Sequence, residues 1–188
     1  MEWLDVVDEN GMPTGETVSR EEAHREGIRH RTSHVWIVRM REGRLQVLAQ
    51  KRSGNKDSYP GCYDISSAGH IPAGVDFIPS ALRELEEELG VTAAPEELVY
   101  CGQRRIRFER SFHGKMFRDN QVSSVYLLWL DREEFRVQKE ELSGVRWFDY
   151  DELLEAVRTN AIPHCIDEEE LEMVRRRSQG DGSPAFSL

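Results

Sequence analysis

The stretch GHIPAGVDFIPSALRELEEELGV (residues 69–91) decides how this chain folds. Its second half predicts a helix over about residues 79–89, because apolar residues recur at the helical spacing of three and four. At about 100° per residue the apolar side chains share one stripe: Ile78, Ala81, Leu82, Leu85 and Leu89. Glu84, Glu87 and Glu88 form a second stripe on nearly the opposite side. We therefore expect the helix to pack on a sheet and to turn these three carboxylates toward a cleft.

The glutamates of this helix have two interpretations. An acidic stripe is ordinarily a solvated face, although like charges four residues apart cost a few tenths of a kcal/mol each and lie here toward the negative end of the helix dipole. Alternatively, the stripe holds a hard divalent cation such as Mg²⁺ or Mn²⁺, which prefers oxygen ligands and removes the repulsion between carboxylates. Helix geometry alone leaves both interpretations open.

The rest of the chain alternates between strand-like and helix-like segments. A short helix is expected to open at Ser19, because Glu22 follows at the spacing of a capping box, and Gly27 is placed to end it. The other expected elements are strands at residues 1–7, 35–40, 45–49, 98–101, 104–109, 122–130 and 144–148, and helices at residues 151–159 and 167–177. The length predicts a single domain, which we place at residues 1–177, with an N-terminal strand and helix extension at 1–34 and a frayed, disordered tail at 178–188.

Composition excludes several kinds of protein. Of the 188 residues, 25 are Lys or Arg and 35 are Asp or Glu, so the net charge is −10. Neither a stable nucleic acid complex nor binding to an anionic membrane is expected at this charge. No run approaches the roughly 18 apolar residues of a membrane-spanning helix, and the first residues do not resemble a secretory signal. Cys62, Cys101 and Cys165 share no metal-binding spacing, which favours the reduced cytoplasm.

Residues 69–91 resemble the signature of the Nudix family, G-x5-E-x7-R-E-U-x-E-E-x-G-U, in which U is aliphatic. Eight of the nine specified positions match, and the exception is Val75, which stands where the family has a glutamate. Outside the signature, residues 47–52 resemble the preceding strand of the family, and residues 145–153 resemble its closing strand and helix. The resemblance implies a fold of the α+β class, a Nudix-type α/β/α sandwich around a mixed β-sheet.

The resemblance also implies hydrolysis of a diphosphate joined to another group, X, with Mg²⁺ or Mn²⁺ as the cofactor. By position, the implied metal ligands are the Gly69 carbonyl and the side chains of Glu84, Glu87 and Glu88. Arg83 would orient the glutamates, so Glu84, Glu87 and Arg83 are the expected catalytic residues. In the family the glutamate replaced by Val75 is mainly a partner of that arginine. We therefore expect Val75 to affect the rate and not the class of reaction.

A second resemblance competes with the first. Residues 8–15, His24, His30 and Trp36 are similar to type I isopentenyl diphosphate isomerases, which share the Nudix fold but move a double bond. Those enzymes bind metal through three histidines, which fall here at His24, His30 and His70, and through two glutamates, which fall at Asp119 and Gln121. Their catalytic cysteine falls at Ala68. Alanine transfers no proton and a glutamine amide is no general base, so a hydrolase is favoured, with an isomerase and a non-catalytic binding module as the alternatives.

Several other residues are candidates for contact with a small diphosphate substrate. Arg52 and Lys56 flank a loop expected to open near the site and could clamp phosphate, and His70 follows the signature glycine. By residue type alone the other histidines are assigned structural or surface roles. The general base stays open between Glu84 and three residues expected in loops, Asp119, Glu140 and Glu141. The identity of X, the number of metal ions and the oligomeric state, including a homodimer, cannot be read from the sequence.

Overall fold

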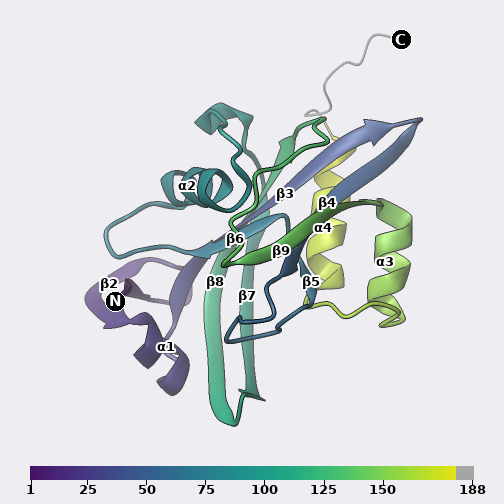
Figure 1. Cartoon of the computed structure of the whole chain (residues 1–188). Helices are drawn as coiled ribbons and strands as arrows, with labels where there is room; N and C mark the ends of the chain where they lie inside the picture. The colour runs from purple at the N-terminus through teal and green to yellow at the C-terminus, as the bar shows by residue number, and fades with distance from the viewer. Residues whose placement is uncertain (181–188) are drawn as a thin grey trace.

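A mixed sheet of seven strands occupies the middle of the molecule (Figure 1). This computed structural model describes residues 1–180, so most of the predicted tail at 178–188 lies outside the described residues. The sheet runs in the order β5 (Tyr63–Asp64), β4 (Arg44–Arg52), β3 (His30–Arg41), β8 (Lys115–Trp129) and β7 (Val99–Phe112), with β6 (Ser67–His70) paired to β3 and β9 (Leu142–Asp149) paired to β4. Among these pairs β3 and β8 run parallel and the others antiparallel.

Helices cover both faces of this sheet (Figure 1). On one face, α2 (Phe77–Leu89) buries Ala81, Leu85 and Leu89, the apolar stripe that the sequence predicts. On the other face, α3 (Tyr150–Arg158) and α4 (Glu168–Ser178) pack around Trp36 and Leu127. A 3-10 turn, η1 (Pro95–Glu97), joins α2 to β7. The expected α/β/α sandwich of the α+β class is confirmed.

The N-terminal extension is a two-stranded sheet followed by a short helix. β1 (Trp3–Val7) pairs antiparallel with β2 (Pro13–Ser19), and α1 (Arg20–Glu26) packs against β8. The Ser19 hydroxyl caps α1 by accepting the Glu22 N–H at 3.3 Å, and Gly27 ends the helix with a φ of 70°, as predicted. Because β3 begins at His30, the last residues of the extension predicted at 1–34 belong to the central sheet.

Three expectations about local structure are wrong. The strands expected at 98–101 and 104–109 are one strand, β7, because pairing with β8 continues through a register shift between Tyr100 and Gly102. Asp119, expected in a loop, lies within β8 for the same reason. Helix α4 extends to Ser178, one residue into the predicted tail, and this residue is buried.

The register of the sheet brings distant residues together at the start of β3. Thr32 of β3 is opposite His70 of β6 on one side and opposite Ser123 of β8 on the other. Side chains alternate between the faces of a sheet, so directly opposed residues project from the same face. This end of the sheet carries the cavity described next.

Candidate functional site

A cavity of about 1000 Å³ is lined by residues of α1, α2, β3, β6, β7 and β8. Two groups of potential metal ligands lie at this cavity, and every member except the fully buried His30 lines it. We call Gly69, Glu84, Glu87 and Glu88 the glutamate centre, and His24, His30, His70 and Asp119 the histidine centre. The loop at residues 53–62 and aromatic side chains such as Tyr59 and Phe108 line the same cavity.

The glutamate centre forms where α2 lies beside β6. Glu88 is buried, and its Oε2 accepts hydrogen bonds from the Ser67 hydroxyl at 2.8 Å and the Ala68 amide at 3.3 Å. Arg83 Nη2 donates to Glu84 Oε1 at 2.7 Å, while Glu87 is exposed on the cavity wall. A Cβ atom on Gly69 would lie 2.7 Å from Glu84 Oε1, so a residue without a side chain is needed for β6 to approach this carboxylate.

The electrostatics of the glutamate centre favour a bound cation. Burial raises the pKa of Glu84 to about 7, against the opposing effect of the Arg83 guanidinium. Burial also raises the pKa of Glu88 to about 8, against the hydrogen bond from Ser67. A nearby cation favours the ionised form of such carboxylates, and clustered carboxylate and carbonyl oxygens are the donors that Mg²⁺ and Mn²⁺ prefer. These residues therefore fit the metal that the sequence predicts.

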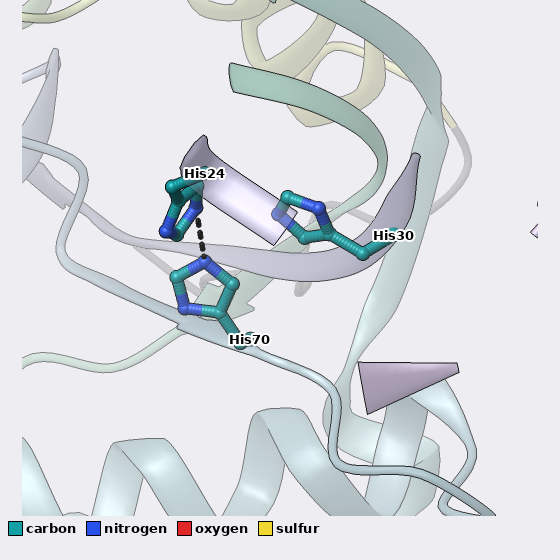
Figure 2. A group of neighbouring side chains, drawn as sticks. All are labelled: His24, His30 and His70. Atoms are coloured by element: carbon teal, nitrogen blue, oxygen red, sulfur yellow. Dashed lines mark hydrogen bonds between the residues drawn. The ribbon is translucent and has the colours of Figure 1, made fainter. Parts of the chain in front are cut away.

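The histidine centre is assembled from four elements, and Figure 2 shows its three imidazole rings close together. One ring nitrogen of each histidine lies within 4.8 Å of the others, and the Nε2 atoms of His24 and His70 are 3.2 Å apart. Asp119 Oδ1 lies 3.8 Å from His30 Nε2 and 4.0 Å from His24 Nε2. Among the described residues, neither His30 Nε2 nor Asp119 Oδ1 has a hydrogen-bond partner, although both atoms are buried.

The histidines are held in the form that binds metal. His30 Nδ1 lies 2.9 Å from the Ile28 carbonyl, to which it donates, so the lone pair of Nε2 is left for a ligand contact. Burial lowers the pKa of His24 to about 3 and lowers the pKa of His30 and of His70. Three neutral imidazoles and a carboxylate are a donor set for a transition metal ion. The two buried atoms without partners fit a cation between them.

The loop cations predicted to clamp phosphate are engaged within the protein. Arg52 donates from Nη1 to Asp64 at 2.9 Å and from Nη2 to the Ser58 carbonyl at 2.9 Å. Lys56 forms an ion pair with Glu141, and both side chains line the cavity. These contacts tie the loop at residues 53–62 to Asp64 of β5 and to Glu141, the residue before β9.

The structure also shows what residue types alone missed. His24 and His30 received structural or surface roles by type, yet both belong to the histidine centre. His24 and His70 are 46 residues apart, so their spacing gives no local signal. The resemblance to the isomerases, which assigns His24, His30, His70 and Asp119 to one set of ligands, was the signal in the sequence that pointed to this group.

Comparison with known proteins establishes the family. The family model of the NUDIX domain matches residues 29–169. The chain is 44% identical over 158 residues to Nudix hydrolase 3 of Arabidopsis thaliana, a match that covers 80% of this chain but only 20% of the plant protein. It is 35% identical over 154 residues to an uncharacterised Nudix hydrolase of Clostridium acetobutylicum, covering 81% of this chain and 72% of that protein. The chain therefore belongs to the Nudix hydrolase family.

Solved structures agree on the fold. DR0079 of Deinococcus radiodurans superposes with a TM-score of 0.64 at 22% identity, over 94% of this chain and 99% of that one. The NUDIX domain of Shewanella oneidensis NrtR, crystallised with ADP ribose, superposes with a TM-score of 0.58 at 16% identity, over 85% of this chain and 99% of that one. Within residues 1–180, no helix has the length and apolar character needed to cross a membrane.

Proposed function

We propose that the protein is a metal-dependent hydrolase that cleaves the diphosphate linkage of a nucleoside di- or triphosphate or of another small X-linked diphosphate. The observation that carries the proposal is the glutamate centre. Glu84 and the buried Glu88 lie against the β6 backbone, Glu87 lies beside them, and all three line a cavity of about 1000 Å³. A cavity of this size accommodates a diphosphate together with its X group.

The roles of the residues follow from this placement. Glu84, Glu87, Glu88 and the Gly69 carbonyl would hold Mg²⁺ or Mn²⁺. Such an ion would supply neutralisation of the diphosphate oxygens and activation of a water for attack at phosphorus. Arg83 would hold the Glu84 carboxylate in place through their 2.7 Å contact.

The cavity wall supplies the contacts proposed for the substrate. Lys56 would release its ion pair with Glu141 and contact a phosphate of the substrate instead. His70, which lines the cavity, would lie next to the reacting end of the substrate. Arg52, bound to Asp64, would contribute by holding the loop that carries Lys56. The general base is open between Glu84, Asp119, Glu140 and Glu141, all of which line the cavity.

The direct test is a Mg²⁺-dependent assay on a panel of nucleoside di- and triphosphates, dinucleotides, nucleotide sugars and isopentenyl diphosphate, with products identified by mass. Glu87→Gln is the diagnostic variant, because Glu87 is exposed and its loss should leave the fold intact. We expect at least one panel member to be hydrolysed and the rate to fall about 100-fold or more in this variant.

Glu86→Gln is the matched control for that test. Glu86 is an exposed neighbour on the same helix and does not line the cavity, so its substitution should leave the rate near that of the wild type. Equal losses in the two variants would argue against a metal site at the glutamate centre. Absence of hydrolysis across the panel would favour the non-catalytic binding module.

The histidine centre supports a second proposal. We propose that it binds a transition metal ion, on the evidence of four convergent donor atoms, two of them buried and without partners among the described residues. An isomerase is the second candidate function, because this is the arrangement that the isomerase resemblance implies. However, Ala68 and Gln121, which line the cavity, lack the proton-transfer groups that an isomerase needs. Isomerisation of isopentenyl diphosphate without release of phosphate would overturn this preference.

A further inference from the structure

Glu170 of α4 is a buried carboxylate that the proposed hydrolysis does not use. Its side chain is 2% exposed and accepts three hydrogen bonds: from Trp36 Nε1 at 2.9 Å, from Arg104 Nη1 at 2.9 Å and from His34 Nδ1 at 3.0 Å. Burial raises the pKa of Glu170, but His34 and Arg104 outweigh burial and hold this pKa at about 2. Glu170 is therefore an acceptor only, and the Nδ1 atom of His34 carries a proton.

His34 begins a chain of hydrogen bonds that leads away from Glu170. Burial opposes protonation of His34, but the Glu170 carboxylate outweighs it and raises the pKa of this imidazole. On the other side of the ring, Nε2 lies 3.4 Å from Thr32 Oγ1. The Thr32 hydroxyl donates to Gln121 Oε1 at 2.6 Å. Since this amide oxygen is occupied by a donor, the amide nitrogen of Gln121 is turned to Asp119 and donates to Oδ2.

The chain ends at the histidine centre. With Oδ2 of Asp119 fixed by Gln121, Oδ1 is the atom turned toward His30 Nε2 at 3.8 Å and His24 Nε2 at 4.0 Å. Contacts therefore run without a break from Glu170, which only accepts, through His34, Thr32 and Gln121 to Asp119. Partners of this kind, one step behind the ligands, commonly set ligand orientation and metal affinity.

We propose that His34, anchored by Glu170, is a positioning residue that acts through Thr32 and Gln121 to hold Asp119 Oδ1 toward the three histidines. Helix α4, which contributes no ligand, then belongs to the structural support of the histidine centre. This inference rests on the proposed binding of metal at that centre and is independent of hydrolysis at the glutamate centre.

The test measures Co²⁺ binding by the full chain in excess Mg²⁺, using the visible absorption of Co²⁺ and titration calorimetry. Thr32→Val removes the hydroxyl that links His34 to Gln121 and keeps the side-chain shape in a buried strand position. We expect Co²⁺ affinity to fall about tenfold and the absorption bands to shift. Ser123 Oγ lies 3.3 Å from the same Gln121 oxygen, so Thr32→Val combined with Ser123→Ala should lower the affinity further, toward 100-fold.

Three further variants complete the design. Thr32→Ser retains the hydroxyl and should restore affinity to near the wild-type value. Glu170→Gln should weaken Co²⁺ binding, whereas Glu169→Gln should not, because Glu169 is an exposed neighbour that also contacts Arg104 but not His34. Thermal melts of each variant confirm that it is folded.

The possible results separate the two proposals. If Thr32→Val and the double variant bind Co²⁺ as tightly as the wild type, with unchanged bands, the positioning role is wrong while the metal centre stands. If wild-type protein gives no absorption typical of nitrogen-ligated Co²⁺, the histidine centre is itself wrong, and the positioning role is overturned with it.

Discussion

The glutamate centre and the histidine centre lie at one cavity, which all their residues except the buried His30 line, but they are built in opposite ways. The glutamate centre comes from a single stretch of 23 residues, in which one helix and the strand before it supply all the ligands. The histidine centre takes its groups from α1, β3, β6 and β8, and His30 and Asp119 meet only because β3 and β8 pair in parallel. The first is a property of local sequence, and the second is a property of sheet register.

Burial also acts on the two centres in opposite directions. It raises the pKa of Glu84 and Glu88 and lowers the pKa of His24, His30 and His70, because burial disfavours the charged form of either group. Carboxylates must therefore lose protons when they take a metal near neutral pH, whereas the imidazoles are already neutral. We expect the two centres to differ in metal preference and in pH dependence.

The largest effect should come from disabling one centre at a time. His70→Ala should lower Co²⁺ affinity at the histidine centre by 100-fold or more, on the order expected for loss of a ligand, while Mg²⁺ still raises the melting temperature. Glu88→Gln should remove the rise in melting temperature with Mg²⁺ and leave Co²⁺ affinity near the wild-type value. The Gln oxygen can still accept from Ser67, but the negative charge is gone.

The measurements are Co²⁺ absorption and thermal melts with and without Mg²⁺. If each variant lost both responses, the two centres would be one cooperative site and the comparison would fail.

An intermediate effect is expected in the stability of the metal-free protein as a function of pH. The folded pKa of Glu88, about 8, lies above its ordinary value of 4.5, so stability should fall as pH rises from about 5 to 8. The folded pKa of His24, about 3, lies below its ordinary value of 6.5, so stability should also fall as pH drops from about 6 to 3. The expected maximum is near pH 5–6.

Urea denaturation across this range measures the effect. On the alkaline side we expect a loss of roughly 2–4 kcal/mol in the free energy of unfolding, since each unit of pKa difference corresponds to about 1.4 kcal/mol. In Glu88→Gln the free energy of unfolding should fall much less between about pH 5 and pH 8 than in the wild type. In Glu86→Gln it should fall as in the wild type. An alkaline loss of equal size in both variants would place its cause outside the glutamate centre.

The smallest effect should come from restoring the signature residue at position 75. Val75→Glu would offer Arg83 a second carboxylate besides Glu84, and an exposed ion pair is worth at most about 1 kcal/mol. We therefore expect the hydrolysis rate to rise by less than about fivefold. Val75→Gln, which has the same length without the charge, is the control. A gain of equal size with Gln would exclude the ion pair as its cause.

Much of the fold follows from local patterns in the sequence. The apolar stripe of α2, its end at Leu89 and the Ser19 cap and Gly27 end of α1 all match the structure, because each depends on neighbours within a few residues. The extent of β7, the position of Asp119 within β8 and the continuation of α4 to Ser178 did not follow. Each depends on contacts with partners distant in the sequence, which composition and periodicity do not encode.

The same division separates the two centres. The sequence by itself determined the stripe of the glutamate centre, because helical periodicity places Glu84, Glu87 and Glu88 together wherever the helix lies, and the family resemblance added its interpretation as a metal site. The resemblance to the isomerases grouped His24, His30, His70 and Asp119, but only the tertiary structure decided how closely they converge. It also decided that Lys56 and Arg52 are occupied by Glu141 and Asp64. The physical reason is the separation along the sequence of the residues that meet. A helix repeats over about four residues, whereas sheet register and helix packing join residues tens of positions apart.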